Sequence, residues 1–192
     1  MSPTSESPER LPVRGEARGS HFDRSEERVV LTEYDPKWPY LFQREAERVR
    51  ETLGDAVLAV EHVGSTAVPG LAAKPCVDVL LLVGDPAEED AYRPALEKAG
   101  YTLHFAEPDF HDHRVFKGPG VTMNLHVFAD GAEPRRMLAL RDRLRADAGD
   151  RGLYERTKRE LAERFRDSVQ DYSEAKTGVI EEILSRAPGA GR

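Results

Sequence analysis

The chain has 192 residues, 39% of them hydrophobic and 33% charged, which fits one domain that can bury a substantial core. Its formal net charge of −7 makes nucleic acid an unlikely partner, because the neutralisation of phosphates supplies most of non-specific affinity. The single cysteine, the lack of an apolar run long enough for a bilayer and the polar N-terminus together favour a cytoplasmic protein with no membrane partner.

The two ends of the chain differ in composition from its middle. Residues 1–27 are rich in Ser, Pro, Glu and Arg and contain few large apolar residues, so they bury too little surface to offset the entropy lost on ordering. Residues 187–192 form a second, short tail. We therefore predict one folded domain over residues 28–186 between two disordered tails.

The predicted domain opens with a strand, a helix and a second strand. The first strand is expected at residues 29–31. Asp35 followed by Pro36 is typical of a helix start, and Gly54 of a helix end, which predicts a helix between them. Residues 57–63 are apolar enough to form the second strand.

The next elements continue this mixed pattern. Residues 76–83 are apolar on both faces apart from Asp78, as expected of a central strand that is covered on both sides. The other expected elements are a helix that begins at Asp85 and Pro86 and ends at Gly100, a strand at residues 101–105, and a hairpin of residues 114–117 and 121–128.

The second half of the domain is predicted to be helical. Three apolar stripes begin near Met137, Tyr154 and Tyr172. Since these stripes must be buried and no linker-like composition separates the two halves, we expect the helices to pack on the sheet. The predicted fold class is α/β, more closely α+β, with a mixed β-sheet core and C-terminal helices packed on it.

A Gly-Ser loop between two predicted strands contains the residues most suited to bind an anion. Gly64 allows a close backbone approach, and Ser65 and Thr66 offer hydroxyl and N–H groups suited to a phosphate. Lys74 lies before the next strand and could neutralise phosphate charge. Asp78, on that strand, is costly unless it is paired, hydrogen-bonded or bound to a cation.

These residues resemble two related signatures. A strand that ends in Gly-Ser and is followed by an acid on the next strand is similar to DNA polymerase β-like nucleotidyltransferases. The longer string from His62 to Asp78 resembles the GrpB family, with its His-Val-Gly-Ser-Thr-x-Val-Pro-Gly-Leu block. Further similar segments are Asn124 to Phe128, Leu140 to Arg145, Tyr154-x-x-x-Lys158 and Tyr172-x-x-x-Lys176. The resemblance implies a nucleotidyltransferase-like core over roughly residues 28–185.

The sequence departs from the nucleotidyltransferase pattern at the metal-binding acids. Such enzymes use two acids two residues apart on one strand and a third on a neighbouring strand, and magnesium prefers oxygen ligands. Asp78 has the first position, but Leu80 has the second and His126 the third. Imidazole suits a transition metal better than magnesium, so Asp78 is a candidate ligand of Mg²⁺ or of a transition metal.

Several other side chains admit a structural and a functional interpretation. His126 shares one side of its strand with Thr122 and Asn124, which suits either a pocket wall or a core histidine. Lys158 and Lys176 could border a nucleotide cleft or lie on helix surfaces. Asp109, His111 and His113 could gather a metal, although a solvent-exposed loop cluster is the simpler interpretation, and Arg141 with Asp142 could tie the helical half to the core.

Two functions remain open from the sequence. In the first, the chain binds a nucleotide or a phosphorylated metabolite at Gly64, Ser65, Thr66 and Lys74, with weak or no standard nucleotidyl transfer. In the second, it is an active metal-dependent nucleotidyl or phosphoryl transferase, with Asp78 and His126 as catalytic residues. A third, weaker alternative is a folding or assembly partner linked to coenzyme A metabolism, because GrpB-like domains are also found fused to dephospho-coenzyme A kinase.

Overall fold

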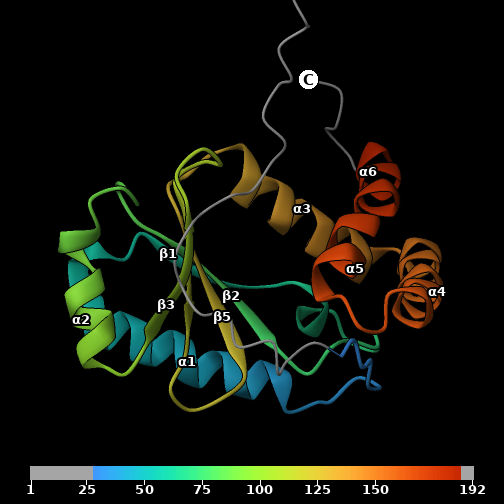
Figure 1. Cartoon of the computed structure of the whole chain (residues 1–192), viewed down its shortest axis with the longest axis horizontal. Helices are drawn as coiled ribbons and strands as arrows, with labels where there is room; N and C mark the ends of the chain where they lie inside the picture. Colours follow the sequence, from blue (N-terminus) through green and yellow to red (C-terminus); the bar gives the residue numbers. More distant parts are fainter. Residues whose placement is uncertain (1–27, 187–192) are drawn as a thin grey trace, which may run out of the picture.

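A computed structural model describes residues 28–186, so the tails predicted at residues 1–27 and 187–192 lie outside the described residues. Its centre is a five-stranded sheet with the order β1-β2-β5-β4-β3 (Figure 1). The strands are β1 (Ala59–Val63), β2 (Val77–Leu82), β3 (Thr102–Glu107), β4 (His113–Lys117) and β5 (Met123–Phe128).

The sheet is mixed, as predicted. β2 runs parallel to β5, while the pairs β1–β2, β4–β5 and β3–β4 are antiparallel. Asp78 pairs with Val63 on one side and with Asn124 on the other. The three strands that were expected to share a sheet are therefore neighbours, and the end of β1 lies beside the start of β2.

One face of the sheet is covered by α1 (Trp38–Leu53) and α2 (Arg93–Lys98). The α1 start is organised by Asp35, whose carboxylate accepts the Lys37 N–H at 2.9 Å, and α1 ends at Gly54, which has a positive φ of 53°. The alternate β2 residues Val77, Val79 and Leu81 form a continuous core with these helices, together with Ala46, Val49, Leu96, Leu125 and Val127.

The other face is covered in part by α3 (Ala132–Ala146), which lies across the sheet in Figure 1. Here Val63, Leu80 and Phe128 are fully buried against Met137 and Leu138 of the helix. Leu80, two positions after Asp78 and on the same face of β2, is therefore part of the core.

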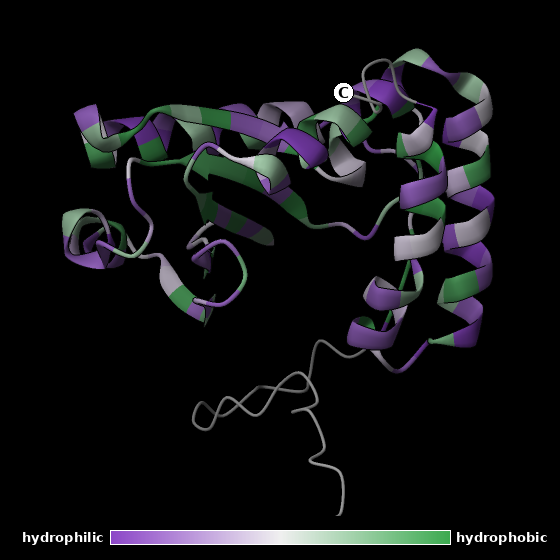
Figure 2. Cartoon of the chain, turned by 90° about the horizontal axis from the view of Figure 1, so that it is seen from above, coloured by the Kyte–Doolittle hydropathy of each residue, from purple (hydrophilic) through white to green (hydrophobic). Residues whose placement is uncertain are grey.

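The remaining helices gather at one end of the sheet (Figures 1 and 2). They are α4 (Ala148–Arg164), α5 (Val169–Ala175) and α6 (Thr177–Ser185), and they pack on the loop after β1 through a cluster formed by Val68, Leu71, Leu144, Tyr154, Val179 and Ile183. Caps start two of them: Asp147 accepts the Asp150 N–H, and Ser168 accepts the Asp171 N–H. The helical half thus belongs to the same body as the sheet and packs on the Gly-Ser loop.

Some predicted elements were wrong or misplaced. Residues 29–31 do not form a strand, because Val29 packs with Ala162 and Tyr172 of the helical half instead of joining the sheet; only Thr32 bridges to Ala73. The helix expected after Asp85 begins as turns, in which the Asp85 carboxylate accepts the Ala87 N–H, and α2 itself starts only at Arg93.

Within residues 28–186, every helix is too short or too polar to cross a lipid bilayer.

Candidate functional site

The loop after β1 and the start of β2 meet at Gly64 and Asp78. Gly64 has a positive φ of 71°, which favours glycine, and a β-carbon there would overlap Asp78 Oδ2. The 3-10 turn η3 (Ser65–Ala67) follows at once. Glycine at this position is therefore required both by the backbone turn and by the carboxylate that lies against it.

Neighbouring side chains hold the Asp78 carboxylate in place. Asn124 Nδ2 donates to Asp78 Oδ1 at 2.8 Å, and His126 Nε2 lies 3.4 Å from the same oxygen. Lys117 Nζ donates to Asn124 Oδ1 at 2.9 Å, which turns the Asn124 amide nitrogen towards Asp78. Asp78 and His126 thus meet beside Gly64, as the strand pattern predicted.

The electrostatic surroundings favour an ionised Asp78. Desolvation acts to raise the pKa of Asp78, but the hydrogen bonds from His126 and Asn124 and the charges of His126 and Lys176 outweigh it, so the pKa is lowered overall. The side chain is 27% exposed, so this carboxylate reaches solvent at the edge of the core.

The donor set does not fit the magnesium ion that the fold family implies. The neighbours of Asp78 are an amide and an imidazole, and Leu80, which holds the second acid position, is fully buried among apolar side chains. Among residues 28–186, no group of three or more His, Cys, Asp or Glu side chains could hold a metal ion.

Ser65 is held by a buried lysine from α4. Lys158 Nζ donates to Ser65 Oγ at 3.1 Å and also to the Ala72 carbonyl, and it lies 5.0 Å from the centre of the Tyr154 ring. Lys158 is only 1% exposed, and desolvation lowers its pKa to about 7. The Ser65 oxygen accepts from Lys158, and Ser65 also hydrogen-bonds to Tyr154, which acts to lower the pKa of Tyr154 against its desolvation.

A second lysine approaches the same place from the end of α5. Lys176 Nζ lies 4.4 Å from the centre of the Tyr172 ring. Desolvation lowers the pKa of Lys176 to about 8, whereas the charge of Asp78 acts in the opposite direction. The two Tyr-x-x-x-Lys segments therefore bring a buried amine, Lys158, beside Ser65 and a half-buried amine, Lys176, close enough to Asp78 for their charges to interact.

The other predicted ligand-binding residues take different places. Thr66 is buried, and its hydroxyl lies 3.0 Å from His62 Nε2, so this hydroxyl belongs to the core side of the turn. His62 stacks on Phe42, and desolvation lowers its pKa to about 4. Lys74 is half-buried and close enough to Lys176 for its charge to lower the pKa of that lysine. Lys176, and not Lys74, is the lysine whose charge lowers the pKa of Asp78.

Two arginines from α3 fix the loop from outside. Arg141 Nη1 donates to the Glu61 carboxylate at 2.8 Å and to the His62 carbonyl at 3.0 Å. Arg145 Nε donates to the Ala67 carbonyl at 2.9 Å. The expected link from Arg141 to the core is therefore real, and it holds the backbone on both sides of Gly64 and Ser65.

His113 is not part of an exposed cluster. It opens β4, is buried, and stacks on Phe128 with ring centres 4.3 Å apart. His111 and Asp112 have positive φ values of 55° and 50° and turn the chain back into the sheet. The simpler interpretation of the 109–113 segment was therefore wrong for His113, which contacts His126.

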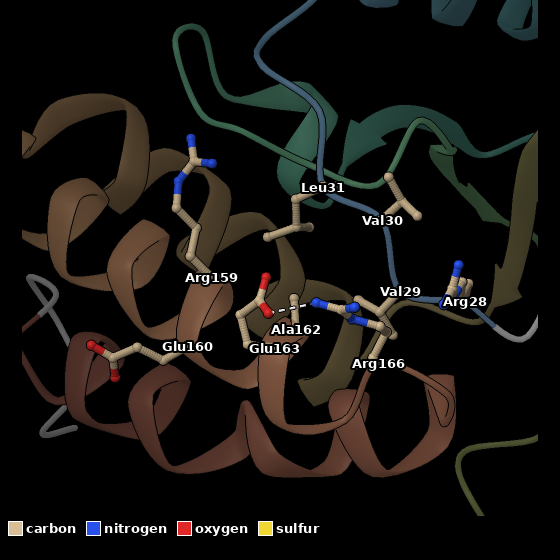
Figure 3. Close-up of a pocket in the computed structure, with 9 residues that line it drawn as sticks. All are labelled: Arg28, Val29, Val30, Leu31, Arg159, Glu160, Ala162, Glu163 and Arg166. Atoms are coloured by element: carbon tan, nitrogen blue, oxygen red, sulfur yellow. Dashed lines mark hydrogen bonds and ion pairs between the residues drawn. The ribbon is translucent and has the colours of Figure 1, made fainter.

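A separate hollow of about 550 Å³ lies between residues 28–31 and α4 (Figure 3). Its polar rim is made of ion-paired side chains, such as Arg166 and Glu163 at 2.7 Å, and Val29 N–H donates to the Arg166 carbonyl. It shares no residue with the Asp78 neighbourhood. The convergence of charged groups, and not the size of a hollow, therefore places the candidate site at Gly64, Ser65, Asp78, Lys158 and Lys176.

Comparisons with known proteins agree with this architecture. The family model described as GrpB protein matches residues 28–186. UPF0157 protein BH1888 of Halalkalibacterium halodurans is 56% identical over 160 residues, which cover 83% of this chain and 82% of that protein. The crystal structure of the conserved protein GrpB from Enterococcus faecalis has a TM-score of 0.70 at 32% identity and covers 81% of this chain and 98% of that one.

A more distant structural likeness concerns the fold alone. Cid1, solved in complex with its short product ApU, has a TM-score of 0.52 at 13% identity, over 74% of this chain and 48% of Cid1. The nucleotidyltransferase-like fold predicted from the Gly-Ser signature is thereby confirmed.

Proposed function

Because the chain belongs to the GrpB family, we propose that it binds a nucleotide or a phosphorylated metabolite at the loop of Gly64 and Ser65, with weak or no standard nucleotidyl transfer. The observation that supports this most is the pair of amines, the buried Lys158 and the half-buried Lys176, that converge on Ser65 and Asp78.

A bound phosphate would complete the charge balance of these lysines. Desolvation lowers the pKa of Lys158 to about 7 and that of Lys176 to about 8, so the negative charges that act on them, Glu155 and Asp78, do not offset the loss of water. An anion at the loop would restore such a partner and raise both pKa values. The Ser65 hydroxyl, which bonds to Lys158 and Tyr154, would exchange its bond to Tyr154 for one to a phosphate oxygen.

Two features argue for binding over standard transfer. A two-metal phosphoryl transfer needs acids that grip both metal ions, and the second and third acid positions are held by the buried Leu80 and by His126. With a phosphate bound, both lysines would also supply positive charge without a metal. Asp78 would then border the phosphate, held in place by Asn124 and His126.

A thermal-shift panel tests the binding step. The full chain is melted with inorganic phosphate, pyrophosphate, ADP and UTP, each with EDTA and with Mg²⁺. A probe present at 100 times its Kd should add about 2.7 kcal/mol of stability. We expect at least one phosphate-bearing probe to stabilise the protein in EDTA, and Lys176→Met to remove that effect.

The matched control is Lys98→Met, since Lys98 is an exposed lysine on α2. It should leave the shift unchanged. No stabilisation by any probe under either condition contradicts the binding proposal. Robust Mg²⁺-dependent nucleotidyl transfer by the unmodified chain would contradict the second half of the proposal and favour the transferase alternative.

A further inference from the structure

Four side chains form one continuous line of polar contacts from the candidate site to the protein surface. Asp78 Oδ1 lies 3.4 Å from His126 Nε2, His126 Nδ1 lies 3.1 Å from His113 Nε2, and His113 Nδ1 lies 2.9 Å from Glu107 Oε2. Each imidazole therefore uses both of its nitrogens, one on each side.

Strand register builds this line. His113 pairs with Glu107 across β3 and β4, whereas His126 pairs with Val115, two residues after His113. Asp78 pairs with Asn124, two residues before His126. Because alternate residues share a face, all four side chains stand on the α3 face of the sheet, in direct or diagonal cross-strand positions.

The two ends of this line are more exposed to solvent than its middle. Glu107 is 49% exposed, His113 is 8% exposed, His126 is 19% exposed and Asp78 is 27% exposed. The rings of Phe105, Phe110 and Phe128 surround His113. The middle of the line is thus shielded from water, while both carboxylates reach solvent.

The charged and titratable groups around the line are few. Arg114 lies beside His113 and is paired with Glu89, and its charge acts on His113. At the other end, Lys176 acts on Asp78, and Asp78 in turn acts on His62 and Tyr154. Lys117 reaches Asp78 through Asn124.

Proton counting constrains this line. Three contacts join four groups, and each contact is a hydrogen bond only if one proton lies in it. Two neutral imidazoles bring two protons, so with both carboxylates ionised one contact would join two acceptors. A third proton is needed. Desolvation lowers the pKa of His113 to about 4, against the effect of Glu107, which disfavours a charge in the middle and directs the third proton towards an end.

We infer that Asp78, His126, His113 and Glu107 form a proton relay that moves negative charge between the candidate site and the surface. In one end state Glu107 holds a proton on Oε2 and Asp78 is ionised. Three protons then shift together: Glu107 Oε2 to His113 Nδ1, His113 Nε2 to His126 Nδ1, and His126 Nε2 to Asp78 Oδ1. Asp78 becomes neutral and Glu107 becomes ionised, and no proton is gained or lost.

The use of this relay rests on the proposed function. A phosphate at Gly64 and Ser65 would meet the carboxylate of Asp78, and the two negative charges would repel each other. The relay removes the charge from Asp78 and leaves it on Glu107, where water screens it. The relay itself needs no ligand, so it is tested separately from binding.

The test is a pH titration of the full chain with ¹⁵N-labelled histidine, followed by NMR. The signals of His113 and His126 are assigned by their loss in His113→Phe and His126→Phe. In the unmodified chain we expect both rings to respond over one shared pH range. Glu107→Gln should change the ¹⁵N shifts of His126 as well as those of His113, although it is His113 that Glu107 contacts.

Two comparisons separate a relay from a charge effect through space. Glu97→Gln removes a carboxylate of similar exposure, 46%, that is paired with Arg93 and lies outside the relay, and it should leave His126 unchanged. In a His113→Phe background, which keeps a ring against Phe128, Glu107→Gln should also have no effect on His126.

Independent titration of the two histidines in the unmodified chain would overturn the relay. So would an equal effect of Glu107→Gln with and without His113. Should His113→Phe not fold, Asp78→Asn gives a second measurement: it must change the ¹⁵N shifts of His113, which it does not touch, and unchanged shifts would refute the relay.

Discussion

The two faces of the central sheet differ in kind. Towards α1 and α2 the strands present a mainly apolar core. The buried polar groups on this side are paired: Glu45 of α1 accepts the Tyr101 hydroxyl at 2.9 Å, His62 contacts Thr66, and Arg114 pairs with Glu89. Towards α3 the face changes from polar to apolar within two residues of β2, from Asp78 to Leu80.

This difference shows how one strand can serve both stability and chemistry. The α1 face is closed to water and contributes mainly hydrophobic stabilisation. The α3 face leaves the start of β2 and β5 uncovered by apolar residues, and α4 and α5 supply lysines there. The candidate site therefore lies on the part of the α3 face where polar and charged side chains replace the apolar core.

The largest expected difference in stability between the two faces concerns two neighbouring residues of β5. Leu125 is fully buried on the α1 face, whereas Asn124 on the α3 face donates to Asp78. Leu125→Ala should lower the free energy of unfolding by about 2–5 kcal/mol. Asn124→Ala should cost only about 1 kcal/mol, the scale of a hydrogen bond. Urea denaturation measures both, and equal losses would show that the faces do not differ in this way.

The next test asks how closely Asp78 is fitted to its loop. Gly64 and Gly70 both have positive φ, 71° and 78°, but a β-carbon at Gly64 would overlap Asp78 Oδ2, whereas nothing lies within 4 Å at Gly70. Gly70→Ala should cost about 1 kcal/mol for the backbone alone. Gly64→Ala should cost about 2–3 kcal/mol, because the carboxylate must also move. Similar losses of unfolding free energy in Gly64→Ala and Gly70→Ala would mean that the Asp78 carboxylate moves aside at little cost.

Much of the fold could be predicted because its elements have local signals. Apolar runs located β1, β2 and β5, and Gly54 ended α1 as expected. The meeting of Asp78 and His126 followed from two strands being neighbours, which the Gly-Ser signature implied. Residues 29–31 showed the limit of such signals, since an apolar triplet packs equally well against helices.

The contacts that complete the candidate site join residues far apart in the chain, so no short sequence pattern predicts them. Lys158 is 93 residues from Ser65, and its burial depends on how α4 packs on the loop. Glu107 and His113 meet only because two residues with positive φ, His111 and Asp112, turn the chain between β3 and β4. A spacing of six residues in a polar segment gives no indication of this.

Buried Lys158 on the α3 side should make stability depend on pH above about 7, whereas His62, which stacks on Phe42 of α1 and has its pKa lowered to about 4, acts only at lower pH. The pKa of Lys158 is lowered to about 7, below its unfolded value, so between these two values the unfolded chain binds a proton that the folded chain does not. Stability should therefore rise with pH from about 7 to about 10.5, by up to ~1.4 kcal/mol per pH unit from this group.

Lys158→Met should remove the rise between pH 7 and 8 and reduce it above pH 8, where Lys176 with its pKa of about 8 still contributes, whereas Lys98→Met, at an exposed position, should keep the whole rise. Urea denaturation at a series of pH values measures the slope. An unchanged slope in Lys158→Met would show that Lys158 keeps its charge on folding, held by the Ala72 carbonyl and Ser65.

The smallest expected change in stability comes from Asp78→Asn, and it separates the functional alternatives most sharply. The amide keeps the shape of the side chain and can still accept from Asn124 and His126. The variant loses the negative charge, so the unfolding free energy should fall by only about 1 kcal/mol. Because the pKa of Asp78 is lowered in the fold, this loss should be present above about pH 4 and should disappear as the pH falls through the folded pKa.

Binding should respond in the opposite direction from stability. If the loop binds a phosphate, removal of a carboxylate beside it should leave the affinity for a stabilising probe such as pyrophosphate intact or raise it, as measured by calorimetry. A catalytic, metal-binding Asp78 would instead make Asp78→Asn lose Mg²⁺-dependent transfer that the unmodified chain performs. A loss near 3 kcal/mol would assign Asp78 to a buried structural pair, since that is the scale of breaking one. Retained affinity with a small loss of stability is what a carboxylate at the polar edge of an otherwise apolar sheet should give.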